Sequence, residues 1–577
     1  MFFMRKFLLS IFLLQVFLGI QSKSLLFDNG QSDYVIVLSS VASQSELTAA
    51  LELQDYLKQI GGVEIPIVNR YDSGRKHVFV GIDERISGML NCPIPADTAE
   101  TFTYMTKDDD LYIFGGRNMG TAYGIFSFLE QQMGVRWYSL DYTKIPRLRQ
   151  YALGQLNHTE SPAFRFRHVL YYQLHHDPLL DAHNLLNMHL GATPCGSYAP
   201  LYSFWETHTF SLLLPPEEFF KDHPEYYSLW EGKRVPNGQL CLSNPKVIRL
   251  LTTRLLDVIK RNPGYLAYSL AQNDNQVYCE CDACHALVQR YGSHSGLLLW
   301  AVNQVAEEID KKLPGTNLIT LAYLYTRQPP KGIRPRQNVF VRLCDIECCF
   351  LHPLEDSPEN AAFMNDLKAW AQLTDHLFVF DYVTNFAQYT APYPNFAVMD
   401  LNLQTFFKYH VAGVMEEGQY ESDGGEFAEL KQWVLSKLMW NPHQDVSTLA
   451  RQFVSDYYGK SANDVWKYYK LCCELVKDDT HARFNSDHNI PLYTDRFVDD
   501  GISLLKKALS ACRHDSIVTR RVEHLLLQPL YLQLKRQPAK AVLNGNCSLY
   551  FRIVRRDGIR MREGTPVETS IREQGYT

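Results

Sequence analysis

Short apolar runs alternate with longer amphipathic stretches through the middle of the chain. In the longer stretches, apolar residues recur every three or four positions, which is typical of helices. The clearest of these stretches are residues 245–261, 294–312, 358–373 and 425–438. The short runs are typical of buried strands and lie near 166–172 and at 187–191, 238–243, 265–270, 318–324, 338–344, 377–383 and 410–416. Eight strands that alternate with helices predict an α/β fold with a (β/α)8 barrel.

A smaller α/β pattern precedes the barrel. An amphipathic helix is predicted at 43–62, where it begins at a Ser cap and ends at a Gly pair, and a second helix starts near Gly120 and ends before Gly134. Strands are predicted at 34–40, 77–81 and 111–116, with another after the second helix. The order strand, helix, strand, strand, helix predicts that the helices cover one face of a small sheet.

Changes in composition divide the chain. Residues 157–164 are polar and contain a proline, and beyond residues 440–445 the pattern is helical to about Leu534. Residues 548–561 are predicted to add one or two strands. The predicted organisation is a signal peptide at 1–22, an α/β accessory domain at 23–158, the barrel at 159–442 and a mostly helical C-terminal region at 443–577.

The N-terminus has the pattern of a secretory signal. Arg5 and Lys6 precede an apolar run at 7–20, and small and polar residues follow, with cleavage expected near Ser22. The run is short for a membrane span, and the alternative is an uncleaved N-terminal anchor. We therefore predict a periplasmic or secreted protein with no integral membrane segment after cleavage.

The composition and net charge indicate which classes of binding partner to expect. The 577 residues are 46% hydrophobic and 21% charged, which is enough for large buried cores. The net charge is −6 and no basic block is present. A nucleic-acid partner is therefore not expected, because nucleic-acid binding requires clustered Lys and Arg.

Polar residues at the ends of the predicted strands form the candidate active site, because barrel enzymes place their chemistry at the C-terminal ends of the strands. The sequence has no Gly-rich phosphate loop, no Ser-centred nucleophile elbow and no His-Glu-x-x-His motif, so no cofactor is expected. Paired carboxylates without a cofactor are typical of glycoside hydrolysis. The candidates are Arg167, His168, Asn273, Asp274, Tyr325, Asp345, Asp381, Tyr382, Glu416 and Glu417.

Asn273 and Asp274 form the first candidate catalytic pair. If the substrate carries a 2-acetamido group, that group can act as the nucleophile, and the protein then needs an acid and a residue that orients the group. Adjacent residues after one strand can supply both. The alternative for Asn-Asp is a turn or a helix cap. For Glu416 and Glu417 the alternative is a solvated loop end.

Four cysteines form a candidate structural site. Cys279, Cys281 and Cys284 have the spacing C-x-C-x-x-C, and Cys241 ends the predicted third strand. Four thiolates could hold a structural zinc ion, and disulfides fit an exported protein equally well. In either state the cysteines would fix the loop that carries Asn273 and Asp274.

Several stretches resemble known families. LTAALELQDYLKQIGGVEIPIV and GGRNMGTAYGIFSFLEQQMGVRWY resemble the N-terminal accessory domain of microbial α-glucuronidases and β-hexosaminidases. QLCLSNP, SLAQNDNQVYCECDAC and GVMEEGQYESDGGEFAELKQWVLSKLMWNP resemble the bacterial glycosidases of domain of unknown function 4838. That group includes the endo-β-N-acetylglucosaminidases of glycoside hydrolase family 163, which act on complex N-glycans. The likeness covers roughly residues 35–460.

The resemblance implies an exported retaining β-N-acetylglucosaminidase that acts on a glycan or glycoprotein by substrate-assisted catalysis. It implies catalytic roles for Asn273, Asp274 and Glu416. Members often have Gln where this chain has Glu417, so Glu416 is the preferred carboxylate. The remaining candidates, Arg167, His168, Tyr325, Asp345, Asp381, Tyr382 and Glu417, are expected to bind the substrate.

Two alternatives remain open. An inverting α-glucuronidase-like hydrolase would use Asp274 or Glu416 as the acid and Asp345 or Glu347 as the base. It would need cations for the uronate, for which Arg167, Arg327 and Arg342 are available. The second alternative is a barrel that binds glycan without cleaving it.

Overall fold

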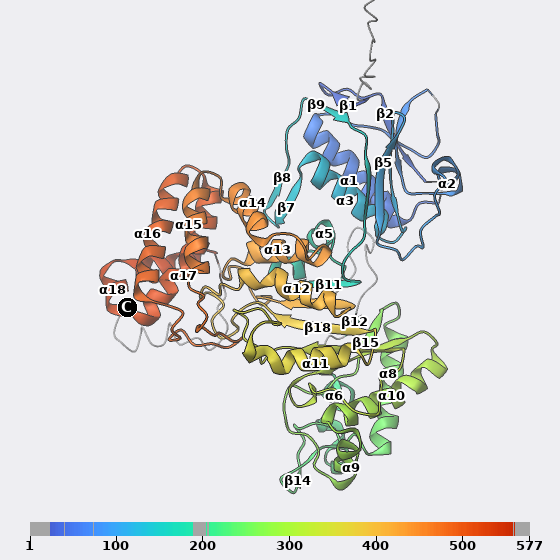
Figure 1. The fold of residues 1–577 in the computed structure, drawn as a ribbon, viewed down its shortest axis with the longest axis vertical. Coiled ribbons are helices and arrows are strands. Elements are labelled where there is room, and N and C mark those ends of the chain that lie inside the picture. Colours follow the sequence, from blue (N-terminus) through green and yellow to red (C-terminus); the bar gives the residue numbers. More distant parts are fainter. Residues whose placement is uncertain are drawn as a thin grey trace, which may run out of the picture.

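The computed structural model describes residues 24–39, 41–72, 74–187, 203–204, 207–557 and 559. The predicted signal peptide therefore lies outside the described residues. Figure 1 shows an N-terminal α/β domain, a central parallel sheet with helices, a lobe below the sheet and a C-terminal group of helices.

The N-terminal domain is built on a mixed six-stranded sheet with the order β10-β5-β6-β4-β2-β3. Its main helix, α1 (Gln44–Gly61), begins with a Ser43–Glu46 capping box and ends at Gly62 in the left-handed conformation, as the Ser and Gly signals predict. The strands are β2 (Tyr34–Leu38), β3 (Ile67–Val68), β4 (Lys76–Val80), β5 (Phe102–Lys107), β6 (Asp110–Gly115) and β10 (Asn157–Glu160). Outside this sheet lie β1 (Ser24–Asp28), β7 (Arg136–Ser139), β8 (Tyr142–Lys144) and β9 (Gln150–Leu153).

Helices cover both faces of this sheet. α1 and α3 (Gly120–Met133) pack on one face, and α2 (Glu84–Leu90) lies on the other (Figure 1). Ile86 of α2 joins a second small core with Val35 and Phe79 of the sheet. The prediction that helices cover only one face is therefore wrong, because alternate residues of β2 and β4 are apolar on both sides.

The central sheet contains seven strands in the order β11-β19-β18-β17-β16-β15-β12, and every neighbouring pair is parallel. Within the described residues this curved sheet remains open between β11 and β12. The prediction of a parallel α/β barrel is thus confirmed as a half-barrel. The strands are β11 (Phe166–Leu170), β12 (Ser203–Phe204), β15 (Ala267–Ser269), β16 (Asn317–Ala322), β17 (Val339–Cys344), β18 (Leu377–Tyr382) and β19 (Gly413–Glu417).

Two predicted strands differ from the structure. The run at 187–191 lies outside the described residues except for Asn187, and β12 is the strand that pairs with β15. The run at 238–243 is not a strand of the sheet: only Leu240 makes an isolated bridge, to Tyr227. The Gln239 backbone N–H instead donates to the carbonyl of Val277, so this run pairs with a loop.

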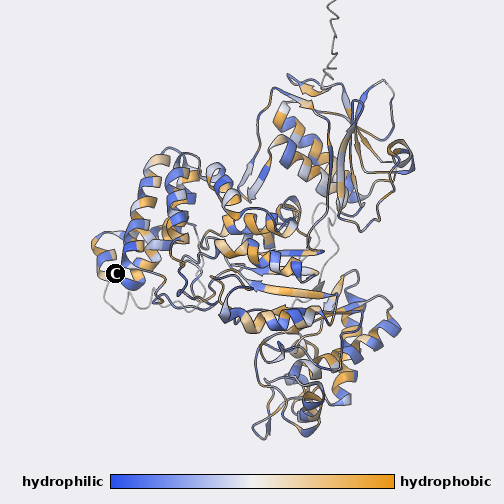
Figure 2. Cartoon of the chain, in the orientation of Figure 1, coloured by the Kyte–Doolittle hydropathy of each residue, from blue (hydrophilic) through white to orange (hydrophobic). Residues whose placement is uncertain are grey.

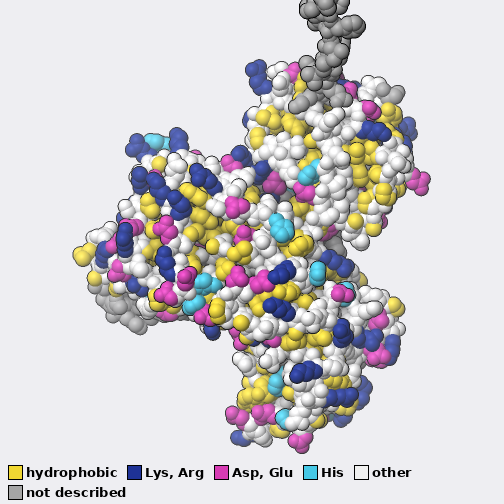
Figure 3. Space-filling model, in the orientation of Figure 1, with side chains coloured by type: hydrophobic (Ala, Val, Ile, Leu, Met, Phe, Trp, Pro, Cys, Tyr) yellow, Lys and Arg dark blue, Asp and Glu magenta, His cyan; other side chains and the backbone are white. Residues whose placement is uncertain are grey.

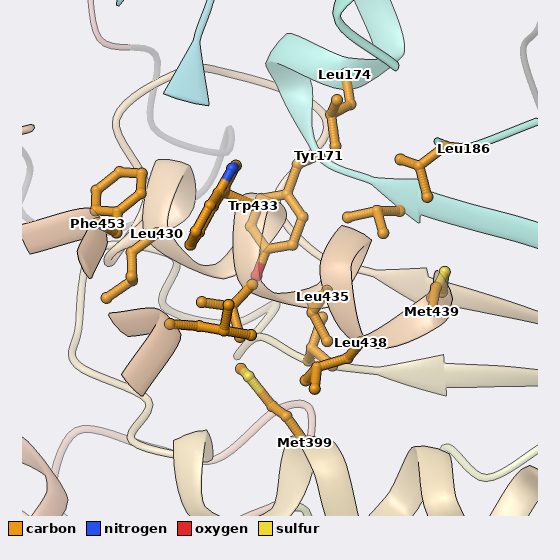
Figure 4. Close-up of a cluster of buried hydrophobic side chains, with 14 of the residues drawn as sticks. Tyr171, Leu174, Leu186, Met399, Leu430, Trp433, Leu435, Leu438, Met439 and Phe453 are labelled. Atoms are coloured by element: carbon orange, nitrogen blue, oxygen red, sulfur yellow. The ribbon is translucent and has the colours of Figure 1, made fainter. Parts of the chain in front are cut away.

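Helices cover the outer face of the sheet. α13 (Ala428–Trp440) is buried along its whole length, because it contacts β11, the accessory domain at β7 and the C-terminal helix α14 (Val446–Tyr458). Figure 4 shows its side chains gathered with Tyr171, Met399 and Phe453. The other helices on this face are α4 (Tyr172–His176), α5 (Pro178–His183), α11 (Ala361–Ala371) and α12 (Met399–Lys408).

The lobe below the sheet has a core of its own. Leu251, Leu255, Val302 and Val305 pack there with Phe210, apart from the large core that joins the rest of the molecule. Its long helices match the predicted bounds. The elements are α6 (Phe210–Leu213), α7 (Pro216–Phe219), β13 (Leu229–Trp230), β14 (Lys233–Arg234), α8 (Pro245–Arg261), α9 (Asp282–Tyr291) and α10 (His294–Lys312).

The C-terminal region is helical to its described end. The predicted strand in 548–561 is wrong, because α19 runs from Asn546 to Asp557. Its apolar residues Tyr550 and Ile553 are three apart, as on one face of a helix. The remaining helices are α15 (Ala462–Cys473), α16 (Asp495–Cys512), α17 (Ser516–Arg536) and α18 (Pro538–Leu543).

The surface is mixed in character. Figure 2 shows apolar residues concentrated on the central strands, and Figure 3 shows acidic and basic side chains interspersed on the visible face. In the part of the chain that the structure describes, no helix is long and apolar enough to cross a membrane.

Candidate active site

A pocket of about 280 Å³ lies at the C-terminal end of the parallel sheet. Leu321, Cys344, Phe380 and Tyr382 line it from neighbouring strands. Since residues two apart on a strand point to the same face, this is the face that also carries the apolar layer of Phe340 and Phe378 below the pocket. Among the described residues, the lining is Thr207, His208, Asp274, Leu321, Tyr323, Cys344, Ile346, Phe380, Tyr382, Phe386, Glu417, Tyr420, Glu421 and Phe484.

Asp274 lies on one wall of the pocket, in the loop after β15. The Tyr323 hydroxyl donates a hydrogen bond of 3.0 Å to its Oδ1. The His208 ring lies 5.8 Å from the Tyr323 ring, and its Nδ1 is 2.8 Å from the carbonyl oxygen of Gln272. These contacts hold the Asp274 carboxylate at the pocket rim while it stays exposed to an incoming ligand.

Glu417 lies on another wall, at the end of β19. It is directly opposite Tyr382 in the parallel register. Burial raises the pKa of Tyr323 well above its ordinary value, and the charge of Asp274 raises it further. Tyr323 therefore keeps its proton and remains a hydrogen-bond donor between two carboxylates.

Aromatic side chains of the barrel, together with Phe484 of the C-terminal region, complete the pocket. The Phe380 and Tyr382 rings stack at 4.9 Å, and Phe386 contacts Phe484 with ring centroids 6.3 Å apart. The backbone of Phe386 donates to the carbonyl of Phe484 at 2.6 Å, and the Asn385 side chain donates to the Ser486 carbonyl at 2.8 Å. The segment between α15 and α16 is therefore held against the barrel as a wall of the site.

Glu416 points to the opposite face of the sheet from Glu417. It is 1% exposed and lies beside Asp381, its register partner on β18. Asp345, which is fully buried, completes a cluster of three carboxyl groups behind the sheet. The structure thus places three predicted site residues, including the preferred carboxylate, away from the pocket.

This buried cluster holds protons tightly. Burial raises the pKa of Asp345 and of Glu416 well above their ordinary values, and the neighbouring Asp381 carboxylate raises both further. Burial raises the pKa of Asp381 to about 6, although hydrogen bonds from Asp345, the Tyr382 backbone and Glu416 lower it in part. The three groups therefore share protons instead of bearing three charges.

Three other predicted residues lie outside the pocket lining. The Asn273 side chain accepts a hydrogen bond from the Ser211 backbone and donates to the Gly238 carbonyl, so it ties two loops together. Arg167 is buried against the accessory domain, where it binds Glu100 at 2.7 Å and lies over the ring of Trp440. His168 is buried on the inner face of β11.

Tyr325 lies outside the pocket lining. Its ring packs on Tyr278 and His294 with centroids 5.4 and 5.5 Å away. Tyr323, two residues earlier, takes the place in the pocket that the sequence suggested for Tyr325. The alternation of Leu321 and Tyr323 along one face of the strand could have identified it. Nothing local indicated Phe484, because its contact with the barrel spans distant parts of the chain.

Within the described part of the chain, two groups of side chains could hold a metal ion. Cys241, Cys279, Cys281 and Cys284 meet in the lower lobe. At the junction with the C-terminal region, the Cys349 sulfur lies 3.4 Å from His352 Nδ1 and 3.6 Å from His481 Nδ1. The second group offers three ligands, and His481 also pairs with Glu359 at 2.5 Å.

A family description matches residues 137–470, more than half of the chain, under the words "Domain of unknown function (DUF4838)". The chain belongs to this family. The DUF4838 match contains the whole described parallel sheet together with Asp274 and Glu417. It ends before Phe484, so one wall of the pocket lies outside the matched residues.

One solved structure supports the fold of this DUF4838 protein. A family GH115 4-O-methyl-α-glucuronidase, BtGH115A, described as specific for decorated arabinogalactans, has a TM-score of 0.59 at 12% identity over 91% of this chain and 77% of its own. The Flavobacterium johnsoniae chitobiase FjGH20 has a TM-score of 0.47 at 9% identity, over 92% of this chain and 93% of its own. No curated protein matches the sequence. The first comparison shows a shared architecture.

Proposed function

We propose that this protein is an exported glycoside hydrolase whose reaction takes place between Asp274 and Glu417. The observation that carries the proposal is one pocket at the C-terminal end of a parallel sheet, with two carboxylates, a tyrosine between them and aromatic walls. Glycoside hydrolysis needs an acid that protonates the leaving oxygen and a second group that stabilises the developing cation. Aromatic faces pack against the apolar faces of sugar rings.

The substrate class that we propose is a β-N-acetylglucosaminide within an N-glycan, cleaved with retention through the acetamido group of the substrate. Glu417 is the proton donor, because it stands on the inner wall among Tyr382, Phe380 and Cys344. Asp274 accepts the acetamido N–H, since its carboxylate is exposed and already oriented by Tyr323. The acetamido oxygen then attacks the anomeric carbon as the leaving oxygen takes the proton from Glu417, and water later opens the cyclic intermediate.

The inverting α-glucuronidase scheme fits this pocket less well. A uronate requires a cation, and among the described residues that line the pocket none is Lys or Arg. Of the three cations considered for this role, Arg167 faces the accessory domain and Arg327 pairs with Glu347 and Asp366. Arg342 is buried in the sheet and does not line the pocket.

Mass spectrometry of glycans released from an N-glycosylated protein tests the proposal. Release of a glycan that lacks one core N-acetylglucosamine supports endo action, and loss of single terminal sugars identifies an exo enzyme. Asp274→Asn and Glu417→Gln should greatly slow release, and NMR of the first product anomer should show retention. Glu416→Gln is the matched control, because it makes the same change one residue away on the other face of β19. Full activity of Glu417→Gln would refute the assignment, and glycan binding without turnover in the unaltered protein would favour the binding-only alternative.

A further inference from the structure

Four cysteine sulfurs converge in the lower lobe, outside the candidate active site. Cys241 Sγ lies 3.6 Å from Cys281 Sγ and 3.9 Å from Cys284 Sγ, and all four sulfurs lie within 4.8 Å of one another. Zinc binds thiolates at about 2.3 Å in a tetrahedron, which separates neighbouring sulfurs by about 3.8 Å. The measured spacing is that of a tetrahedral four-thiolate site.

Hydrogen-bond donors surround the sulfurs. The Leu229 backbone N–H donates to Cys279 Sγ at 3.4 Å, and Arg234 donates to it at 3.7 Å. Cys281 is the N-cap of α9 and Cys284 lies in its first turn, where the helix dipole favours negative charge. Such donors stabilise metal-bound thiolates, as outer-shell groups do in known metal sites.

Disulfides explain this arrangement less well. A disulfide brings two sulfurs to about 2.0 Å and separates that pair from other partners. Here Cys241 is at nearly equal distances from two other cysteines.

We propose that Cys241, Cys279, Cys281 and Cys284 bind one structural zinc ion. All four ligands come from the protein, so the site has no open position for substrate. Its role is to join the segment around Cys241 to the loop that leaves β15. Gln239 completes that connection: its Nε2 donates to the Asn273 and Asn275 carbonyls at 2.9 and 2.8 Å, and its Oε1 accepts from the Asn273 N–H. Asp274 lies between these two anchored residues.

Metal analysis of the purified full-length protein tests the proposal directly. We expect one zinc per chain by inductively coupled plasma mass spectrometry, and cobalt exchange should give the intense visible bands of a tetrahedral thiolate site. Cys281→Ser should lose most of the zinc, whereas Cys92→Ser, a half-buried cysteine of the accessory domain, should keep it. If Cys281→Ser does not fold, the metal content and cobalt spectrum of the unaltered protein still decide. Metal-free protein in which peptide mapping finds these four cysteines as disulfides or as free thiols would overturn the proposal.

Discussion

Neighbouring carboxylates have opposite surroundings on the two faces of the parallel sheet. Glu417 and Tyr382 form a register pair on the face that lines the pocket, and Glu416 and Asp381 form the adjacent pair on the face covered by helices. On the first face a carboxylate meets a tyrosine, aromatic rings and space for a ligand. On the second face, carboxyl groups are buried together and retain protons. One step along a strand therefore separates a group available for chemistry from one confined to the interior.

The largest expected effect separates the two glutamates. Glu417→Gln should lower the rate of glycoside cleavage by about 10²–10⁴-fold, the usual contribution of a general acid. Glu416→Gln should leave the rate within a few-fold of the unaltered enzyme, because its side chain does not reach the pocket. Steady-state kinetics on the released glycan measure both. Equal losses in the two variants would show that the faces do not differ in function.

The next effect concerns the tyrosine between the two pocket carboxylates. Tyr323→Phe removes the 3.0 Å hydrogen bond to Asp274 and should lower kcat about tenfold, since a hydrogen bond to a charged group contributes about 1.5–3 kcal/mol. Tyr325→Phe is the matched control, because Tyr325 lies outside the pocket lining. A comparable loss in the control would indicate a general effect on the loop.

The buried cluster of Asp345, Asp381 and Glu416 should affect the pH dependence of stability and not the rate of catalysis. The pKa of Asp381 is raised to about 6, and those of Asp345 and Glu416 are raised further above their unfolded values of about 4. As the pH rises above about 4, the unfolded chain releases protons that the folded protein retains, so the free energy of unfolding falls. This loss continues through pH 6 and beyond.

Glu416→Gln removes one of these proton-retaining groups. Between pH 5 and pH 8 its Tm should fall by about 1–2 °C less than that of the unaltered protein, which corresponds to about 1–2 kcal/mol. Asp274→Asn, at an exposed carboxylate, should follow the unaltered protein. Thermal unfolding at the two pH values measures the difference, and parallel changes in all three proteins would contradict the protonated cluster.

The smallest expected effect is at the outer wall. Phe484→Ala removes the ring that contacts Phe386 and should raise KM a few-fold with little change in kcat, because the ring packs beside the substrate without reaching the reacting atoms. Leu543→Ala, at an exposed position in α18, is the control. A selective fall in kcat would place Phe484 closer to the chemistry than we infer.

Local signals predicted much of this fold. The bounds of α8 and α10 follow from a Pro in the first turn of α8 and from paired basic residues in the last turn of each helix. Six of the eight predicted strands lie in the sheet. The run at 238–243 was predicted as a strand of the sheet, but its backbone pairs with the loop at Val277. The local sequence does not indicate this distant contact.

The site was harder to predict for a physical reason. Strands of a parallel sheet are buried on both faces, so their apolar runs do not show which face a polar residue will take. Asp274, Glu417 and Tyr382 were among the candidates. The choice between Glu416 and Glu417, however, required knowing which of the two side chains faces the pocket. Arg167 was also a candidate because of its place on a predicted strand. In the structure it pairs with Glu100, which lies in the accessory domain.

The position of Phe484 has a consequence for how this protein can diversify. The family match ends at residue 470, so this ring lies outside it, while Asp274 and Glu417 lie within it. Relatives could exchange or lengthen the tail and so reshape the rim without disturbing the reacting groups. A protein trimmed at that boundary would lose this side of the pocket, and it would also lose α16 and α17, whose apolar residues belong to the same core as the central sheet.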